Sequence, residues 1–297
     1  MAAVVGVAPA RRAGASRVAA LVAVALAGCI ALAACGGSGH PPSAARAVSR
    51  YLSGVDAVER SLASPLRSVS RVTAELGVRG SHPTVAEADG LMAALRRIEI
   101  LRARLADLRA PTEAARLRSL LLELVDSEAT LTRQTAALVA FLPPFSSALA
   151  AISPATSRLA RELADNRGTT AAAVAALDAR KADALRSFRA TIDGVLARLL
   201  PLRPPPVSLA GWRAQVSSLR GMAAAAGALA AALSSGSVRT VPALLGRLEA
   251  AASATRALTV QRAQRAAIRS YDARLAGLST LAVAAQQARA RLAAKLG

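Results

Sequence analysis

LMAALRRIEILRARLADL, at residues 91–108, is the stretch of sequence that decides the fold. Its apolar side chains recur at steps of three and four, at Leu91, Leu95, Ile98, Leu101, Leu105 and Leu108. This spacing places them on one face of an α-helix. Pro111 ends the pattern, because proline disrupts the interior of a helix. The stretch therefore predicts an amphipathic helix that packs its leucines against other helices.

The same spacing recurs along the rest of the chain. Four further stripes run through Val48, Leu52, Val55, Val58, Leu62, Leu66, Val69, Val72 and Leu76; Leu117, Leu121, Leu124, Leu131, Leu138 and Leu142; Val174, Leu177, Leu185, Phe188, Ile192, Val195 and Leu199; and Trp212, Val216, Leu219, Met222, Leu229 and Leu233. Trp212 is interpreted as a helix anchor in the core. The stripes predict a series of long helices that share apolar faces.

Prolines and capping residues give the expected helix ends. Pro65 is expected to kink or split the first helix near Ser64, and the pair at 143–144 to end the third. Thr170 is a candidate N-cap of the fourth helix, and prolines at 204–206 separate it from the fifth. After residue 240 the pattern continues to about Lys295, which would make one helix of about 80 Å if it is unbroken.

The composition favours helices over sheets. Hydrophobic residues make up 54% of the 297 residues but aromatic residues only 2%. Strands favour β-branched and aromatic side chains, whereas Ala and Leu favour helices. We therefore expect an all-α fold, an elongated bundle of about five or six long helices.

The first residues have a different character. Arg11, Arg12 and Arg17 precede an apolar run at 18–34 that ends Leu32, Ala33, Ala34, Cys35 and is followed by Gly36, Gly37, Ser38 and Gly39. A basic region followed by an apolar region is typical of a secretory signal. The segment resembles bacterial lipoprotein precursors. The resemblance implies recognition of Leu32, Ala33 and Ala34 by signal peptidase II, attachment of fatty acyl chains such as palmitate at Cys35, and a location on the extracytoplasmic face of the cell membrane.

Two alternatives to this N-terminus remain open. The residues before Cys29 also match the lipobox, but only Cys35 is followed by a flexible Gly/Ser tether, so Cys35 is the expected site. An uncleaved transmembrane anchor is the second alternative, because 17 residues lie at the lower limit for a membrane span. The predicted organisation is a signal peptide at 1–34, a tether at 35–43 and a helical bundle at 44–297.

A repeat inside the bundle is a further hypothesis. Ala103, Arg104 and Leu105 before Pro111 resemble the residues at 197–199 before the second proline cluster. This likeness indicates two helical hairpins, at about 86–142 and 170–234, followed by a long C-terminal helix.

The charge of the chain is strongly positive and unevenly distributed. The formal net charge is +20, and residues 194–297 carry 14 basic side chains against Glu249 and Asp272. Such a segment would attract anionic lipids or wall polymers. The scarcity of aromatic residues argues against nucleic acid as a partner, because base stacking needs them.

The residue types needed for catalysis are scarce. The two histidines, His40 and His82, lie in the tether and in a loop, and no Glu-x-x-His pair or Gly-rich phosphate loop occurs. We expect no enzyme activity, no cofactor and no metal site. Glu123 and Asp126 are interpreted as a solvated helix face.

Two charged residues occupy positions on apolar stripes. Steps of three and four from Leu121 reach Glu128, and the fourth stripe reaches Lys181 in the same way. A charge on an apolar stripe must be paired or must reach solvent. The two side chains are therefore a possible buried charge pair, or else both lie where their stripes drift to the edge.

The expected function is a non-catalytic binding or scaffolding module at the cell envelope, held by lipid on Cys35 and able to bind a protein partner or a second copy of itself. The alternative is a receptor lipoprotein that captures a ligand in a cleft between helices. Such a cleft would need convergent aromatic and polar side chains.

Overall fold

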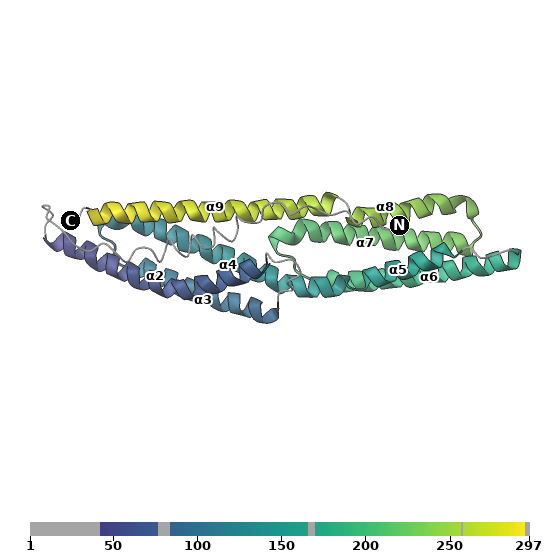
Figure 1. The fold of residues 1–297 in the computed structure, drawn as a ribbon, viewed down its shortest axis with the longest axis horizontal. Helices are drawn as coiled ribbons and strands as arrows, with labels where there is room; N and C mark the ends of the chain where they lie inside the picture. Colours follow the sequence, from purple (N-terminus) through teal and green to yellow (C-terminus); the bar gives the residue numbers. More distant parts are fainter. Residues whose placement is uncertain (1–41, 77–83, 166–169, 257, 295–297) are drawn as a thin grey trace. The chain divides into compact units, whose positions relative to one another are not determined.

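The computed structural model describes residues 42–76, 84–165, 170–256 and 258–294, and these form helices with no strand (Figure 1). The predicted signal peptide and almost all of the tether lie outside the described residues. In chain order the elements are α2 (Pro42–Leu76), α3 (Val85–Asp107), η1 (Thr112–Ala114), α4 (Ala115–Leu149), α5 (Ile152–Ala164), α6 (Ala171–Leu199), α7 (Pro206–Ser234), η2 (Val238–Thr240), α8 (Val241–Arg256) and α9 (Leu258–Ala294). The all-α prediction is confirmed.

The described helices divide between two compact units. The first unit comprises the residues up to Val139 together with those from Arg269 onward, and the second comprises Ala140–Ile268. Helix α4 therefore contributes its longer N-terminal part to the first unit and its last turns to the second.

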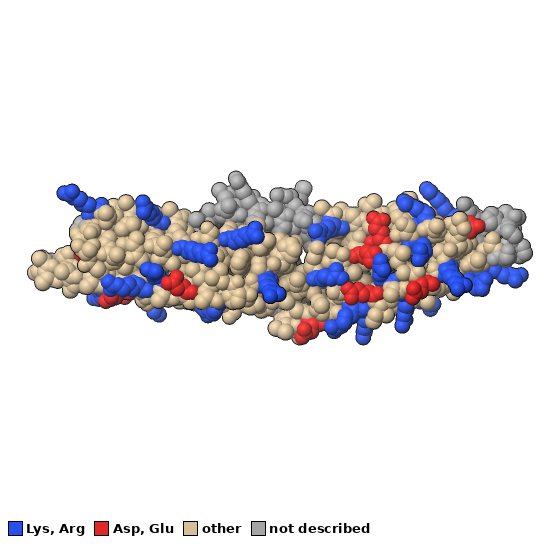
Figure 2. All heavy atoms as spheres, turned by 180° about the vertical axis from the view of Figure 1, so that it is seen from behind, with Lys and Arg blue, Asp and Glu red and all other residues tan. Residues whose placement is uncertain are grey.

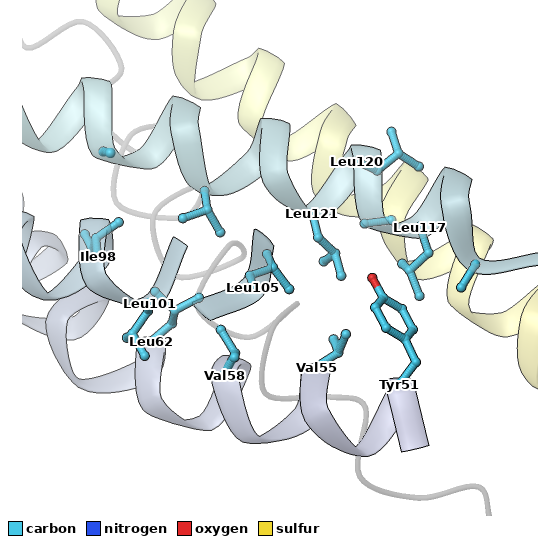
Figure 3. Packing of buried hydrophobic residues seen from close by; sticks show 14 of the residues in the cluster. Tyr51, Val55, Val58, Leu62, Ile98, Leu101, Leu105, Leu117, Leu120 and Leu121 are labelled. Carbon is cyan, nitrogen blue, oxygen red and sulfur yellow. The ribbon is translucent and has the colours of Figure 1, made fainter. Parts of the chain in front are cut away.

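The core of the first unit is formed by α2, α3, α4 and α9. Val55, Ile98 and Leu105 are almost completely buried, and Leu292 of α9 packs in the same cluster. Figure 3 shows Val55 and Val58 of α2 pointing toward leucines of α3 and α4. The stripes predicted at 48–76 and 91–108 supply half of the buried side chains of this cluster, so their helical spacing is confirmed.

The start of α3 is fixed by a capping box. The Thr84 hydroxyl accepts a hydrogen bond from the Glu87 amide at 3.3 Å, and the Glu87 carboxylate accepts one from the Thr84 amide. Each bond satisfies an amide that has no partner inside the helix.

The core of the second unit is formed by α5 to α8 and the last turns of α4. Leu185, Ile192 and Leu199 of α6 are fully buried and share a cluster with Leu219 and Leu229 of α7. Thr170 caps α6, as predicted, by accepting a hydrogen bond from the Ala173 amide at 3.2 Å. Trp212 packs against this core and donates its indole N–H to the Leu199 carbonyl at 3.3 Å.

Prolines interrupt the helices less than the sequence predicts. Pro65 lies inside the single helix α2, and α4 continues through Pro143 and Pro144 to Leu149, so the predicted end at this pair is wrong. Phe141 is buried and its ring stacks on Phe145 at a centroid distance of 5.0 Å. This packing within the second unit offsets the backbone hydrogen bonds that the prolines cannot donate.

The C-terminal prediction also needs correction. The pattern after residue 240 forms two helices, α8 and α9, and α5 is a further helix that no predicted stripe contains. Helix α8 packs on α7 in the second unit, whereas the part of α9 from Arg269 onward belongs to the first unit. Val174 is also not a core residue, since it is 44% exposed.

Within the described residues, two helical segments have the length and apolar composition of a membrane span, Thr112–Ala164 and Pro206–Ser234. The second of these is α7, whose Leu219, Ala226 and Leu229 lie in the core of the second unit. Packing inside the unit accounts for the apolar character of α7.

Candidate functional site

The most unusual chemistry in the described residues is a group of polar side chains inside the first unit. Glu128 lies on α4 and is only 8% exposed, although its neighbours are apolar. It lines a cavity of about 20 Å³ together with Glu59 of α2. The remaining lining comes from Val55, Val58, Leu62, Leu66, Ile98, Leu105, Leu121, Leu124 and Val125.

The cavity limits what these carboxyl groups can do. A water molecule needs about 10–15 Å³ of such space, so the cavity has room for about one water and for no larger molecule. A carboxyl with a shifted pKa is a frequent sign of an acid or base catalyst. The space beside Glu128 is therefore of a size for water, and the carboxyl is placed for proton uptake.

Burial determines the protonation of Glu128. Because the apolar surroundings penalise its charged form, burial raises the pKa of Glu128 to about 7. Among the described residues, none forms a hydrogen bond or an ion pair with this carboxyl. Glu128 is thus close to half protonated at neutral pH.

Glu59 is held differently, by an arginine of α9. Arg289 donates to the Glu59 carboxylate at 2.8 Å and also pairs with Asp56, one turn earlier on α2. The Arg289 and Glu59 side chains are 14% and 13% exposed. Burial raises the pKa of Glu59 above its usual value, and the charge of Arg289 opposes this rise. These two ion pairs join α2 to α9, the first and last described helices of the first unit.

Tyr51 is buried in the same core. Figure 3 shows its ring reaching from α2 toward Leu117 and Leu121 of α4. Its hydroxyl has no hydrogen-bond partner among the described residues, and burial raises its pKa. The buried Thr132 hydroxyl of α4 is also unpartnered in the described part of the chain.

An open groove lies on the first unit between α4 and α9. Its volume is about 650 Å³, and its lining residues are Glu123, Asp126, Ser127, Thr130, Leu131, Gln134, Arg274, Gly277, Leu278 and Leu281. Several polar groups of this lining already have partners. Arg102 binds Asp126 through two nitrogens, at 2.8 and 3.1 Å, and Arg274 donates to Gln134.

The predicted site residues fall into three groups. Leu32, Ala33, Ala34 and Cys35, with the alternative Cys29, lie outside the described residues. Asp126 lies on a solvated helix face, as expected, with its side chain 52% exposed. Glu128 is buried in the first unit, and Lys181 is half-buried on α6 of the second. The pairing of Glu128 with Lys181 stays a prediction.

Several residues of this site could not be found from the sequence. Arg289 lies more than two hundred positions from Asp56 and Glu59 and meets them only through the tertiary fold. Spacing does give one signal, because Glu59 directly follows the buried stripe residue Val58.

Metal binding and surface charge complete the description. No group of three or more His, Cys, Asp or Glu side chains could hold a metal ion in the described ranges. Figure 2 shows a face on which Lys and Arg side chains outnumber Asp and Glu. On α7, α8 and their connections the exposed arginines are Arg203, Arg213, Arg220, Arg239 and Arg247, with Glu249 as an exposed acid.

The fold and the site define an all-α protein whose described residues form two compact units, the first of which holds a buried carboxyl group. No protein-family model, no curated protein and no solved structure matches the chain.

Proposed function

We propose that this protein is a lipid-anchored, non-catalytic binding or scaffolding module on the extracytoplasmic face of a bacterial cell membrane. The observation that carries the proposal is the sequence Leu32, Ala33, Ala34, Cys35 at the end of an apolar run, directly before a glycine-rich tether. Helical units with apolar cores follow this tether. Their surfaces are rich in arginine, which suits contact with anionic partners.

The test is lipid labelling in a bacterial host. Cells that express the full chain are grown with labelled palmitate, and membranes are separated from soluble material. We expect Cys35→Ala to abolish labelling and to release the protein or leave it with an uncleaved leader. Cys29→Ala is the matched control and should remain labelled. Labelling that survives Cys35→Ala but not Cys29→Ala would move the anchor to Cys29. Labelling that survives both would end the proposal of a lipid anchor.

The groove between α4 and α9 favours a second candidate function, the capture of a small ligand. It combines charged and amide side chains with Leu131 and Leu278, although no aromatic residue is among its lining. Mass spectrometry of the purified protein under native conditions would test this. A stoichiometric small molecule that is lost in Arg274→Ala would favour the receptor, and its absence would favour the scaffold.

A further inference from the structure

Helix α3 exposes an apolar stripe on the side opposite its core face. Val85 is 69% exposed, Met92 41% and Ile100 56%. With about 100° of rotation per residue, these three positions cluster on one side of the helix. Buried residues such as Leu91 and Ile98 lie on the other side. The exposed stripe also contains the exposed residues Asp89, Ala93 and Arg96.

The stripe has the same pattern when it is read from either end. An apolar side chain stands at each end, at Val85 and Ile100, and Met92 and Ala93 occupy the centre. Between them lie two opposite charges, Asp89 and Arg96, at equal distances from the centre. Two antiparallel copies of the stripe would therefore be complementary to each other.

The two charges of the stripe are available for such a contact. Other charges of α3 pair with α4: Arg102 binds Asp126 at 2.8 Å, and Arg133 binds Glu99 at 2.7 Å. Among the ion pairs of the described residues, none includes Asp89 or Arg96. The helix thus pairs the charges that flank α4 and leaves the outward pair exposed.

We propose that this face of α3 binds a second copy of the chain in an antiparallel, two-fold symmetric contact. Val85 then packs against Ile100 of the partner subunit, and Asp89 pairs with Arg96 of the partner subunit, twice because of the symmetry. Charges beside an apolar seam select the orientation of paired helices. A parallel contact would place Asp89 against Asp89 and Arg96 against Arg96, so like charges disfavour it.

The net charge of +20 opposes the approach of two copies. Salt screens this repulsion beyond about 8 Å at physiological ionic strength, whereas the contact charges lie closer than that. An anionic lipid surface would not select a stripe with an acid at this position, so a second copy suits the charges better. The inference deepens the proposed scaffolding role, and the biological purpose of the contact rests on that role. The contact itself does not need the lipid anchor.

Charge exchange tests the contact. The full chain, with Cys29→Ala and Cys35→Ala, is purified in mild detergent, and its mass is followed by sedimentation over a range of concentrations. We expect a monomer–dimer equilibrium. Asp89→Arg and Arg96→Asp each create two repulsive pairs and should raise the dissociation constant at least about tenfold. The double variant Asp89→Arg with Arg96→Asp restores opposite charges and should return the constant to within about threefold of the original.

Matched controls separate the contact from net charge. Glu249→Arg and Arg220→Asp, both exposed in the second unit, change the charge by the same amounts and should leave the dissociation constant unchanged. Circular dichroism should show equal helicity in every variant. As a second measurement, Met92→Cys lies beside the two-fold axis and should form a disulfide-linked dimer, whereas Val174→Cys on α6 should not.

Each contrary result overturns the proposal. A chain that stays monomeric up to about 100 µM has no such contact. A dimer that ignores both single changes, that is not restored by the double exchange, or that weakens equally in the controls does not use this face. A monomer whose binding to anionic vesicles is lost in Arg96→Asp would assign the stripe to a lipid surface instead. Loss of palmitate labelling concerns the anchor alone, so the two proposals fail separately.

Discussion

Glu128 shows how one buried side chain links stability to pH. Its carboxyl titrates near 4.5 in an unfolded chain, and burial raises its pKa to about 7 in the folded protein. Between these values the folded state binds a proton that the unfolded state does not. Stability contributed by protonated Glu128 is therefore complete below about pH 4.5 and is lost as the pH rises to 7. The loss amounts to about 3 kcal/mol, since each pKa unit corresponds to about 1.4 kcal/mol.

The change Glu128→Gln removes this dependence. Glutamine has the shape of the protonated acid and carries no charge at any pH. We expect the variant to exceed the wild type in unfolding free energy by about 3 kcal/mol at pH 8 and to match it within about 0.5 kcal/mol at pH 4. Urea unfolding at several pH values measures the difference. A variant that is less stable than the wild type at pH 8 would show that the carboxylate has a favourable partner.

A substitution of Lys181 tests whether Lys181 is that partner of Glu128. If the two charges form one buried pair, removing either alone costs about 3–5 kcal/mol. In that case Lys181→Met should strongly change the effect of Glu128→Gln on the free energy of unfolding, which a double-mutant cycle measures. We expect no coupling, because burial is the cause that raises the pKa of Glu128.

The sequence could identify Glu128 but not its surroundings. Steps of three and four from Leu121 reach it, so helical spacing alone places a charge on an apolar face. Spacing cannot show which helices cover that face. The ion pair between Arg289 and Glu59 joins α9 to α2, and only the tertiary fold reveals it.

At the scale of helices, apolar spacing predicted what is buried better than proline predicted where helices end. Proline removes one hydrogen bond and costs about 3 kcal/mol in a helix interior. In α4 the buried Phe141 and its stacking on Phe145 stabilise the helix beyond Pro143 and Pro144. A proline therefore fails to mark a helix end where side-chain packing stabilises the helix by more than the proline destabilises it. The predicted Thr170 cap was not overridden in this way, because it acts at a helix end.

The arginines of α7 and α8 lead to a prediction about anionic surfaces. Each arginine near such a surface contributes about 1 kcal/mol. Replacing four of them by glutamine should weaken binding of the purified full chain to anionic vesicles at least about tenfold, and high salt should weaken the wild type similarly. The four positions are Arg213, Arg220, Arg239 and Arg247. Vesicle co-sedimentation measures the binding.

An equal loss of charge from α2 is the control for this prediction. Four of its five exposed arginines are changed to glutamine in the same way: Arg46, Arg60, Arg67 and Arg71. We expect a smaller effect from this set. If both sets weaken vesicle binding equally, the binding depends on the net charge of the chain and not on the arginines of α7 and α8 in particular. Binding to neutral vesicles that equals binding to anionic ones would contradict the electrostatic basis altogether.

At the scale of the whole chain, the division into two units was not visible in the sequence. The sequence analysis treats residues 44–297 as one bundle, whereas the structural boundary at Val139 and Ala140 falls within the continuous helix α4. Composition does not change there, since both sides continue the same apolar spacing. The hypothesis of two repeated hairpins also remains open.

Separate cores predict separate unfolding. Ile98 in the first unit and Ile192 in the second are both 0% exposed, so Ile→Val removes one buried methylene group from each core in matched fashion. Each change should cost about 1 kcal/mol and lower the melting temperature of its own unit by about 2–4 °C. We expect calorimetry of the full chain to show two transitions, with Ile98→Val moving one and Ile192→Val the other. If either substitution shifts both transitions equally, or if one sharp transition is seen, the continuous helix α4 couples the units into a single cooperative structure. The double variant distinguishes these cases, because independent units add their shifts without interaction.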